Sequence, residues 1–81
     1  MLTKSMWELA VLNGVQDRVR GDEVNYRIRK EYSQSEENAI LRKMIQNPDD
    51  EKVRDDFNRF NKFVEDTINE VDILIMEFEI W

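Results

Sequence analysis

The second half of the chain carries an apolar repeat that constrains its fold more than any other feature. Nine positions recur at alternating spacings of four and three residues: Val53, Phe57, Phe60, Val64, Thr67, Val71, Leu74, Phe78 and Trp81. Such spacing places side chains on one face of an α-helix. The repeat therefore predicts one long helix that begins near Pro48, with Asn47 as its N-cap. Phenylalanine and threonine suit a two-stranded coiled coil poorly, which favours packing of this face on other helices of the chain.

Two capping boxes predict shorter helices in the first half. Ser5-x-x-Glu8 is followed by apolar residues at helical spacing and by Gly14, a residue suited to a left-handed C-terminal cap. These signals predict a helix over 6–13. Ser33-x-x-Glu36 precedes a second apolar stripe and predicts a helix over 34–46.

Residues 15–32 are compatible with two structures. Read with a period of two, they form a β-hairpin over 15–28 that turns near Gly21. Read with a helical period, Val24, Ile28 and Tyr32 share one face of a helix over 23–32. An isolated hairpin is marginal in water and the chain offers no clear third strand, so the helix is favoured. We expect residues 1–81 to form a single all-α domain, with short helices packed on the long C-terminal helix.

Composition excludes most catalytic chemistries. The chain contains no cysteine and no histidine, which removes the usual thiolate and imidazole ligands and bases. Two glycines and one proline leave no phosphate-binding loop. Acidic pairs such as Glu36-Glu37 are explained by the negative charge that helix N-termini prefer. We expect no enzymatic activity, no cofactor, no metal site and no small-molecule substrate.

Charge is distributed unevenly along the chain. The net charge is −6, and residues 48–81 hold eleven Asp and Glu against four Lys and Arg. An acidic half of this kind disfavours binding to nucleic acid and to anionic membranes. With neither a signal peptide nor a membrane-spanning stretch in the sequence, the expected location is the cytoplasm of a host cell, or a virion.

Residues 71–81 form an apolar tail, which is predicted to bind another protein. The tail offers seven large apolar side chains within nine residues: Ile73, Leu74, Ile75, Met76, Phe78, Ile80 and Trp81. It fits a helix or a strand, and three short helices can cover only part of a helix that is apolar all round. We expect a homo-oligomer, with seven partner-binding residues: Phe57, Phe60, Val64, Val71, Leu74, Phe78 and Trp81.

The stretch from Tyr26 to Arg42, with Trp7-Glu8-Leu9-Ala10 before it and Phe60-Asn61-x-Phe63-Val64-Glu65 after it, resembles small helical proteins encoded by bacteriophages and prophages. No site residues carry over from this group. The resemblance implies a viral origin and a binding role, hence a non-enzymatic assembly or adaptor protein.

An alternative function is inhibition of a host or defence protein, with the acidic residues of the long helix occupying a basic nucleic-acid groove. Eight carboxylates would carry that binding: Asp49, Asp50, Glu51, Asp55, Asp56, Glu65, Asp66 and Glu70.

Overall fold

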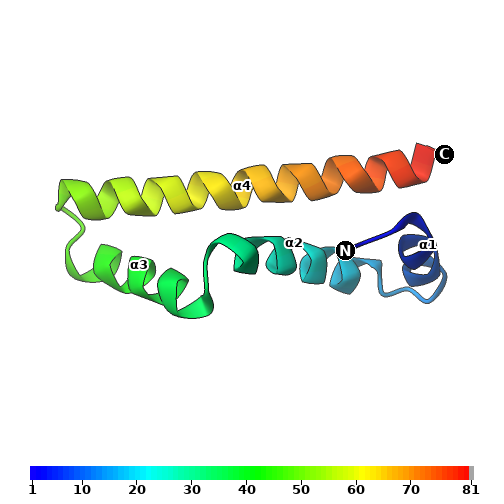
Figure 1. The fold of residues 1–81 in the computed structure, drawn as a ribbon, viewed down its shortest axis with the longest axis horizontal. Helices are drawn as coiled ribbons and strands as arrows, with labels where there is room; N and C mark the ends of the chain where they lie inside the picture. The colour runs from blue at the N-terminus through cyan, green and yellow to red at the C-terminus, as the bar shows by residue number, and fades with distance from the viewer. Residues whose placement is uncertain (81) are drawn as a thin grey trace.

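The computed structural model describes residues 1–80, and over this range it contains four helices and no strand. They are α1 (Lys4–Leu12), α2 (Gln16–Glu31), α3 (Gln34–Gln46) and α4 (Glu51–Ile80). The three short helices follow one another along one side of α4, which runs back in the opposite direction (Figure 1). The molecule is elongated, with extents of 47 × 20 × 18 Å. The expected all-α fold, with short helices packed on a long C-terminal helix, is confirmed.

The apolar repeat of α4 faces the short helices. Each of its members between Val53 and Phe78 is buried or half-buried, and Val71 is completely inaccessible to solvent. The helix continues through the tail to Ile80, so the strand alternative for 71–80 is wrong. Trp81 lies outside the described residues.

Two apolar clusters hold α4 to the other helices. The first consists of Leu2, Trp7, Val71 and Ile75, and Val19, Val24 and Phe78 pack against it. The second is aromatic and lies nearer the middle of α4. In it the Tyr32 ring meets Phe60 edge-on at 5.0 Å between centroids and Phe63 at 5.5 Å. The fold therefore depends on contacts at both the α1 end and the centre of the molecule.

Residues 16–31 form one helix, so the hairpin alternative is wrong and the predicted helix over 23–32 is too short. Gly21 lies inside α2 rather than in a turn. Glycine in a helix costs about 1 kcal/mol relative to alanine. Packing on α4 offsets this cost, because Ile28 is buried and Arg20 forms an ion pair with Asp72 of α4.

The starts of α1 and α4 differ from the predicted ones. Thr3, not Ser5, caps α1 by accepting a hydrogen bond from the Met6 N–H at 3.3 Å. Asp50 takes the role expected of Asn47, since its carboxylate accepts from the Val53 N–H at 3.1 Å. Residues 47–50 instead form a turn closed by the Asp50 N–H on the Asn47 carbonyl at 3.2 Å. Pro48 suits the second position of such a turn as well as a helix start.

Two predicted helix ends are confirmed. Gly14 has a φ of +69°, and its N–H donates to the Val11 carbonyl while the Val15 N–H donates to the Ala10 carbonyl. This pair of bonds is the Schellman motif. At the start of α3, the Ser33 and Glu36 side chains form the reciprocal capping box.

Replacing each of the two glycines with alanine is expected to change the free energy of unfolding in opposite directions. Gly14→Ala places a side chain on a left-handed backbone and should lower the free energy of unfolding by about 1 kcal/mol. Gly21→Ala meets no neighbour within 4 Å inside α2 and should raise it by about 0.5–1 kcal/mol. Urea denaturation followed by circular dichroism measures both changes, and shifts of the same sign would contradict this account.

Candidate functional site

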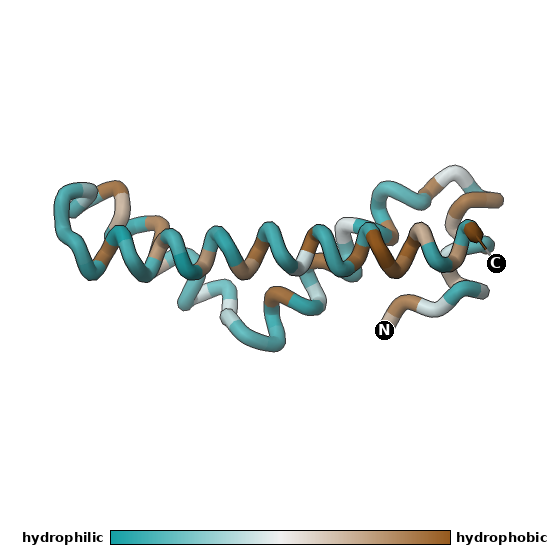
Figure 2. Tube along the Cα trace, turned by 90° about the horizontal axis from the view of Figure 1, so that it is seen from above, coloured by the Kyte–Doolittle hydropathy of each residue, from teal (hydrophilic) through white to brown (hydrophobic). Residues whose placement is uncertain are grey.

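Large exposed apolar side chains gather at the end of the molecule where α1 covers the last turns of α4. Figure 2 shows the hydrophobic colouring along this part of α4 and on α1 beside it. We define the tail surface as Ile73, Met76 and Ile80, which are 57%, 58% and 71% exposed. The α1 surface consists of Met6, Leu9 and Leu12, all exposed. Exposed apolar patches in small proteins commonly mark interaction sites.

Helix geometry explains why these residues remain uncovered. In α4, Val71, Ile75 and Phe78 face the core, and Ile73 and Ile80 lie on the opposite side of the helix. In α1, Trp7 and Ala10 are the buried residues, so Met6 and Leu9 are left to solvent. Both helices carry more apolar surface than one short helical layer can cover.

An open groove runs between α1 and α4 at this end of the molecule. Its lining consists of Trp7, Glu8, Val11, Phe78 and Glu79, and its volume is about 430 Å³. Trp7 and Phe78 belong to the apolar core or pack against it, while Glu8 and Glu79 are exposed. The groove therefore combines an aromatic floor with an acidic rim.

The residues predicted to bind a partner lie mainly on the face of α4 that packs on the short helices. Phe60 and Val71 are buried, and Phe57, Val64, Leu74 and Phe78 are half-buried. Trp81 lies outside the described residues. The role of this set in binding a partner stays a prediction.

The residues of the tail surface were predicted only as members of the apolar tail. Ile73, Met76 and Ile80 repeat the three-four spacing of Val71, Leu74 and Phe78 but are displaced from them by two residues, which places them on another face of the helix. The α1 surface has no signal of its own in the sequence, because helical periodicity does not show which residues of a short helix other helices will cover.

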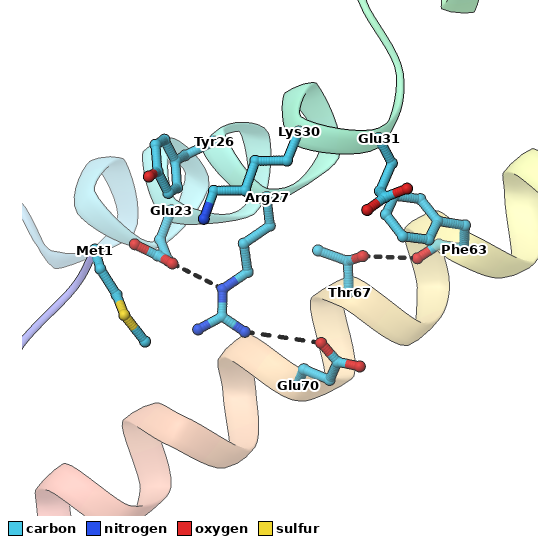
Figure 3. Close-up of a pocket in the computed structure, with 9 residues that line it drawn as sticks. All are labelled: Met1, Glu23, Tyr26, Arg27, Lys30, Glu31, Phe63, Thr67 and Glu70. Atoms are coloured by element: carbon cyan, nitrogen blue, oxygen red, sulfur yellow. Dashed lines mark hydrogen bonds and ion pairs between the residues drawn. The ribbon is translucent and has the colours of Figure 1, made fainter.

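A second pocket lies between α2 and α4 and is built around a buried carboxylate (Figure 3). Glu23 is buried, and its Oε1 accepts from the Leu2 N–H at 2.8 Å. Its Oε2 accepts from Arg27 Nε at 2.7 Å, and Arg27 also lies 3.8 Å from Glu70. This network fastens the N-terminal segment to α2 and α2 to α4.

The polar groups of this second pocket are largely matched within the fold. The Thr67 hydroxyl donates to the Phe63 carbonyl at 2.8 Å, and the Lys30 ammonium lies 4.6 Å from the centre of the Tyr26 ring. Within residues 1–80, no three carboxylates gather closely enough to hold a metal ion. The pocket is therefore described best as a structural clasp between the N-terminal segment, α2 and α4.

A bidentate ion pair joins α2 to α4 beside the first apolar cluster. Arg20 Nε and Nη2 donate to the two oxygens of Asp72 at 2.6 and 3.0 Å. The hydrogen bond from Arg20, together with its positive charge, lowers the pKa of Asp72. The same contact raises the pKa of Arg20. The Arg20 and Asp72 side chains are 40% and 45% exposed, so solvent screens the pair.

Asp72→Asn is expected to reduce stability at neutral pH but not in strong acid. The pKa of Asp72 is lower in the folded than in the unfolded chain. Its stabilising effect is therefore complete at pH values above the unfolded-state pKa, and it is lost as the pH falls through the folded-state pKa. We expect a loss of at most about 1 kcal/mol, decreasing with added salt. Urea denaturation across a pH series measures it. A difference between variant and wild type that persists in strong acid would contradict this assignment.

None of the helices within residues 1–80 is both long enough and apolar enough to cross a membrane. Comparison with protein families, curated proteins and solved structures finds no match for the chain.

Proposed function

We propose that this protein is a non-enzymatic assembly or adaptor protein that works by associating with other protein chains. The observation that carries this proposal is the concentration of exposed apolar side chains on the tail surface and the α1 surface, at one end of the molecule. Fully burying one such side chain contributes about 1.5–3 kcal/mol. The resemblance of residues 26–42 to phage and prophage proteins adds a proposed setting, an infected cell or a virion.

Removing the apolar side chains of the tail surface tests this proposal without disturbing the core. We expect the wild-type mass measured by light scattering to rise with concentration over the micromolar range. The double variant Ile73→Ser/Ile80→Ser should weaken this association at least about tenfold, because it removes roughly 2 kcal/mol or more of apolar burial. Both residues are exposed, so the variant should keep its helices by circular dichroism.

A matched control lies at the other end of the molecule. Leu41→Ser/Ile45→Ser removes two exposed apolar side chains of α3 and should leave association unchanged. If the wild type is a monodisperse monomer at all these concentrations and the tail variant gains no solubility, the proposal is wrong.

Inhibition of a nucleic-acid-binding protein is a second candidate, favoured by the accessibility of the acidic side chains. All eight carboxylates of this hypothesis are exposed except Asp56, which is half-buried. Binding through them would weaken steeply with added salt, whereas association through apolar surfaces would not. A salt series of the partner-binding measurement therefore separates the two functions.

A further inference from the structure

We propose that the groove between α1 and α4 binds a cationic segment of a partner protein, in which an apolar anchor residue is flanked by lysines or arginines. This inference rests on the proposed function, because it assumes that the protein acts by binding another chain. It adds the chemistry of the partner and the place where it docks.

The groove has the size and the lining to accept an apolar side chain. Its volume of about 430 Å³ exceeds that of any single side chain and falls within the range of small-molecule sites. Trp7 and Phe78 form a firm floor, since Trp7 is only 6% exposed and Phe78 packs against the core cluster. Val11 is 48% exposed and extends the apolar wall along α1. An anchor residue placed here would rest on the aromatic floor and against the α1 wall, with its outer side open.

Charge around the groove favours a cationic partner. Glu8 and Glu79 form its rim. No lysine or arginine follows Lys62 in the chain, whereas six carboxylates do. Lys4 lies 3.9 Å from the Glu8 carboxylate and offsets part of its charge, and Arg20 is held by Asp72. Complementary potentials of this kind select partners by charge.

The same charge argues against a second copy as the occupant of the groove. The tail of another copy would bring its own Glu77 and Glu79 to a rim that already holds two carboxylates. Like charges placed together across an interface oppose association and select against such a partner. A lysine-rich segment brings the opposite charge.

Trp7, which lines the groove, also carries a buried polar atom that lacks a partner within the fold. The Trp7 Nε1–H is buried and finds no hydrogen-bond acceptor among residues 1–80. Buried tryptophan N–H groups usually donate to an acceptor. This N–H is inaccessible in the free protein, so a bound segment reaches it only if the Trp7 ring moves, and the acidic rim is the observation that selects the occupant.

Three synthetic helical peptides with identical leucines and one tryptophan test the proposal by calorimetric titration of the full-length chain. Their remaining positions are filled with lysine, glutamine or glutamate. We expect the lysine peptide to bind, the glutamine peptide to bind at least about tenfold more weakly, and the glutamate peptide not to bind. The titration is made below the concentration at which the protein associates with itself.

Paired variants locate the binding. Glu8→Gln/Glu79→Gln should lower the affinity for the lysine peptide about tenfold. The control Glu51→Gln/Asp55→Asn removes the same charge at the far end of α4 and should change this affinity less than about twofold. Likewise, Val11→Ser should weaken binding, and the matched surface substitution Ile45→Ser should not. Circular dichroism confirms that each variant is folded.

Several outcomes would overturn the inference. Equal losses of affinity in the two charge variants would show that the peptide binds a diffuse acidic surface. Equal binding of all three peptides would show that charge does not determine which partner binds. If the lysine peptide fails to bind while light scattering still shows association through the tail surface, the groove proposal falls and the proposed function stands. If the lysine peptide fails to bind and light scattering shows no association, both the groove proposal and the proposed function are wrong.

Discussion

Replacing Val71 with aspartate is expected to unfold the protein. Val71 is fully inaccessible and lies in the cluster with Leu2, Trp7 and Ile75. An unpaired carboxylate in such a site costs several kcal/mol, and a core of this size supplies only about 3–5 kcal/mol of net stability. We therefore expect the helical circular dichroism signal and the cooperative urea transition both to be lost.

Ile73→Asp provides the control for this prediction. It places the same carboxylate on the same helix two residues away, at a position that is 57% exposed. The variant should remain folded, with a stability change of roughly 0.5 kcal/mol or less. Val71→Ala should fall between the two, with a loss of about 1–3 kcal/mol from apolar contact and the remaining cavity. A Val71→Asp protein as stable as Ile73→Asp would mean that α4 packs through a different face.

Replacing Glu23 with alanine is expected to produce the next largest loss, about 3 kcal/mol. The substitution removes the acceptor of the buried Leu2 N–H and the nearest partner of Arg27, whose side chain is only 23% exposed. The Leu2 N–H would then lack a partner, and Arg27 would keep only the exposed carboxylate of Glu70 at 3.8 Å. An unmatched buried donor costs far more than a matched pair contributes. Urea denaturation measures the total effect. Hydrogen exchange of the Leu2 amide reports separately on the release of the N-terminal segment.

Two milder substitutions in the same network show which of its bonds contributes most to stability. Glu23→Gln keeps an oxygen acceptor for the Leu2 N–H but loses the charge, so it should be less harmful than alanine. Glu70→Gln removes the exposed member, which lies 3.8 Å from Arg27, and should cost less than about 1 kcal/mol. If Glu23→Ala leaves both the unfolding free energy and the exchange of Leu2 unchanged, Glu23 does not act as the clasp described here.

If the assembly and groove proposals are correct, the first half of α4 serves folding alone, whereas its last turns serve both folding and binding. Its first half closes the fold against α3, which has no fully buried residue of its own. Its last turns carry both the core residue Ile75 and the exposed tail surface, so a deletion of residues 73–81 would disturb folding together with binding. Substitutions at Ile73 and Ile80 avoid this ambiguity.

The sequence by itself determined the features that depend on neighbouring residues. The four-three repeat identified the face of α4 that packs on the short helices, and the Ser33 box and Gly14 marked the start of α3 and the end of α1. These signals are local, because capping bonds and helical periodicity involve residues within one or two turns. The cap of α4 escaped prediction, since Pro48 fits a turn and a helix start equally well.

Only the tertiary structure decided the features that require distant segments to meet. Residues 16–31 are helical through Gly21 because α4 offers Asp72 to Arg20 and an apolar face to Ile28. Glu23 is buried because Leu2, 21 residues away, folds over it. The groove forms where Trp7, Glu8 and Val11 of α1 meet Phe78 and Glu79 of α4. Helical periodicity tells which residues share a face, but it does not tell which faces remain uncovered, since that depends on how many other helices the chain can place against them.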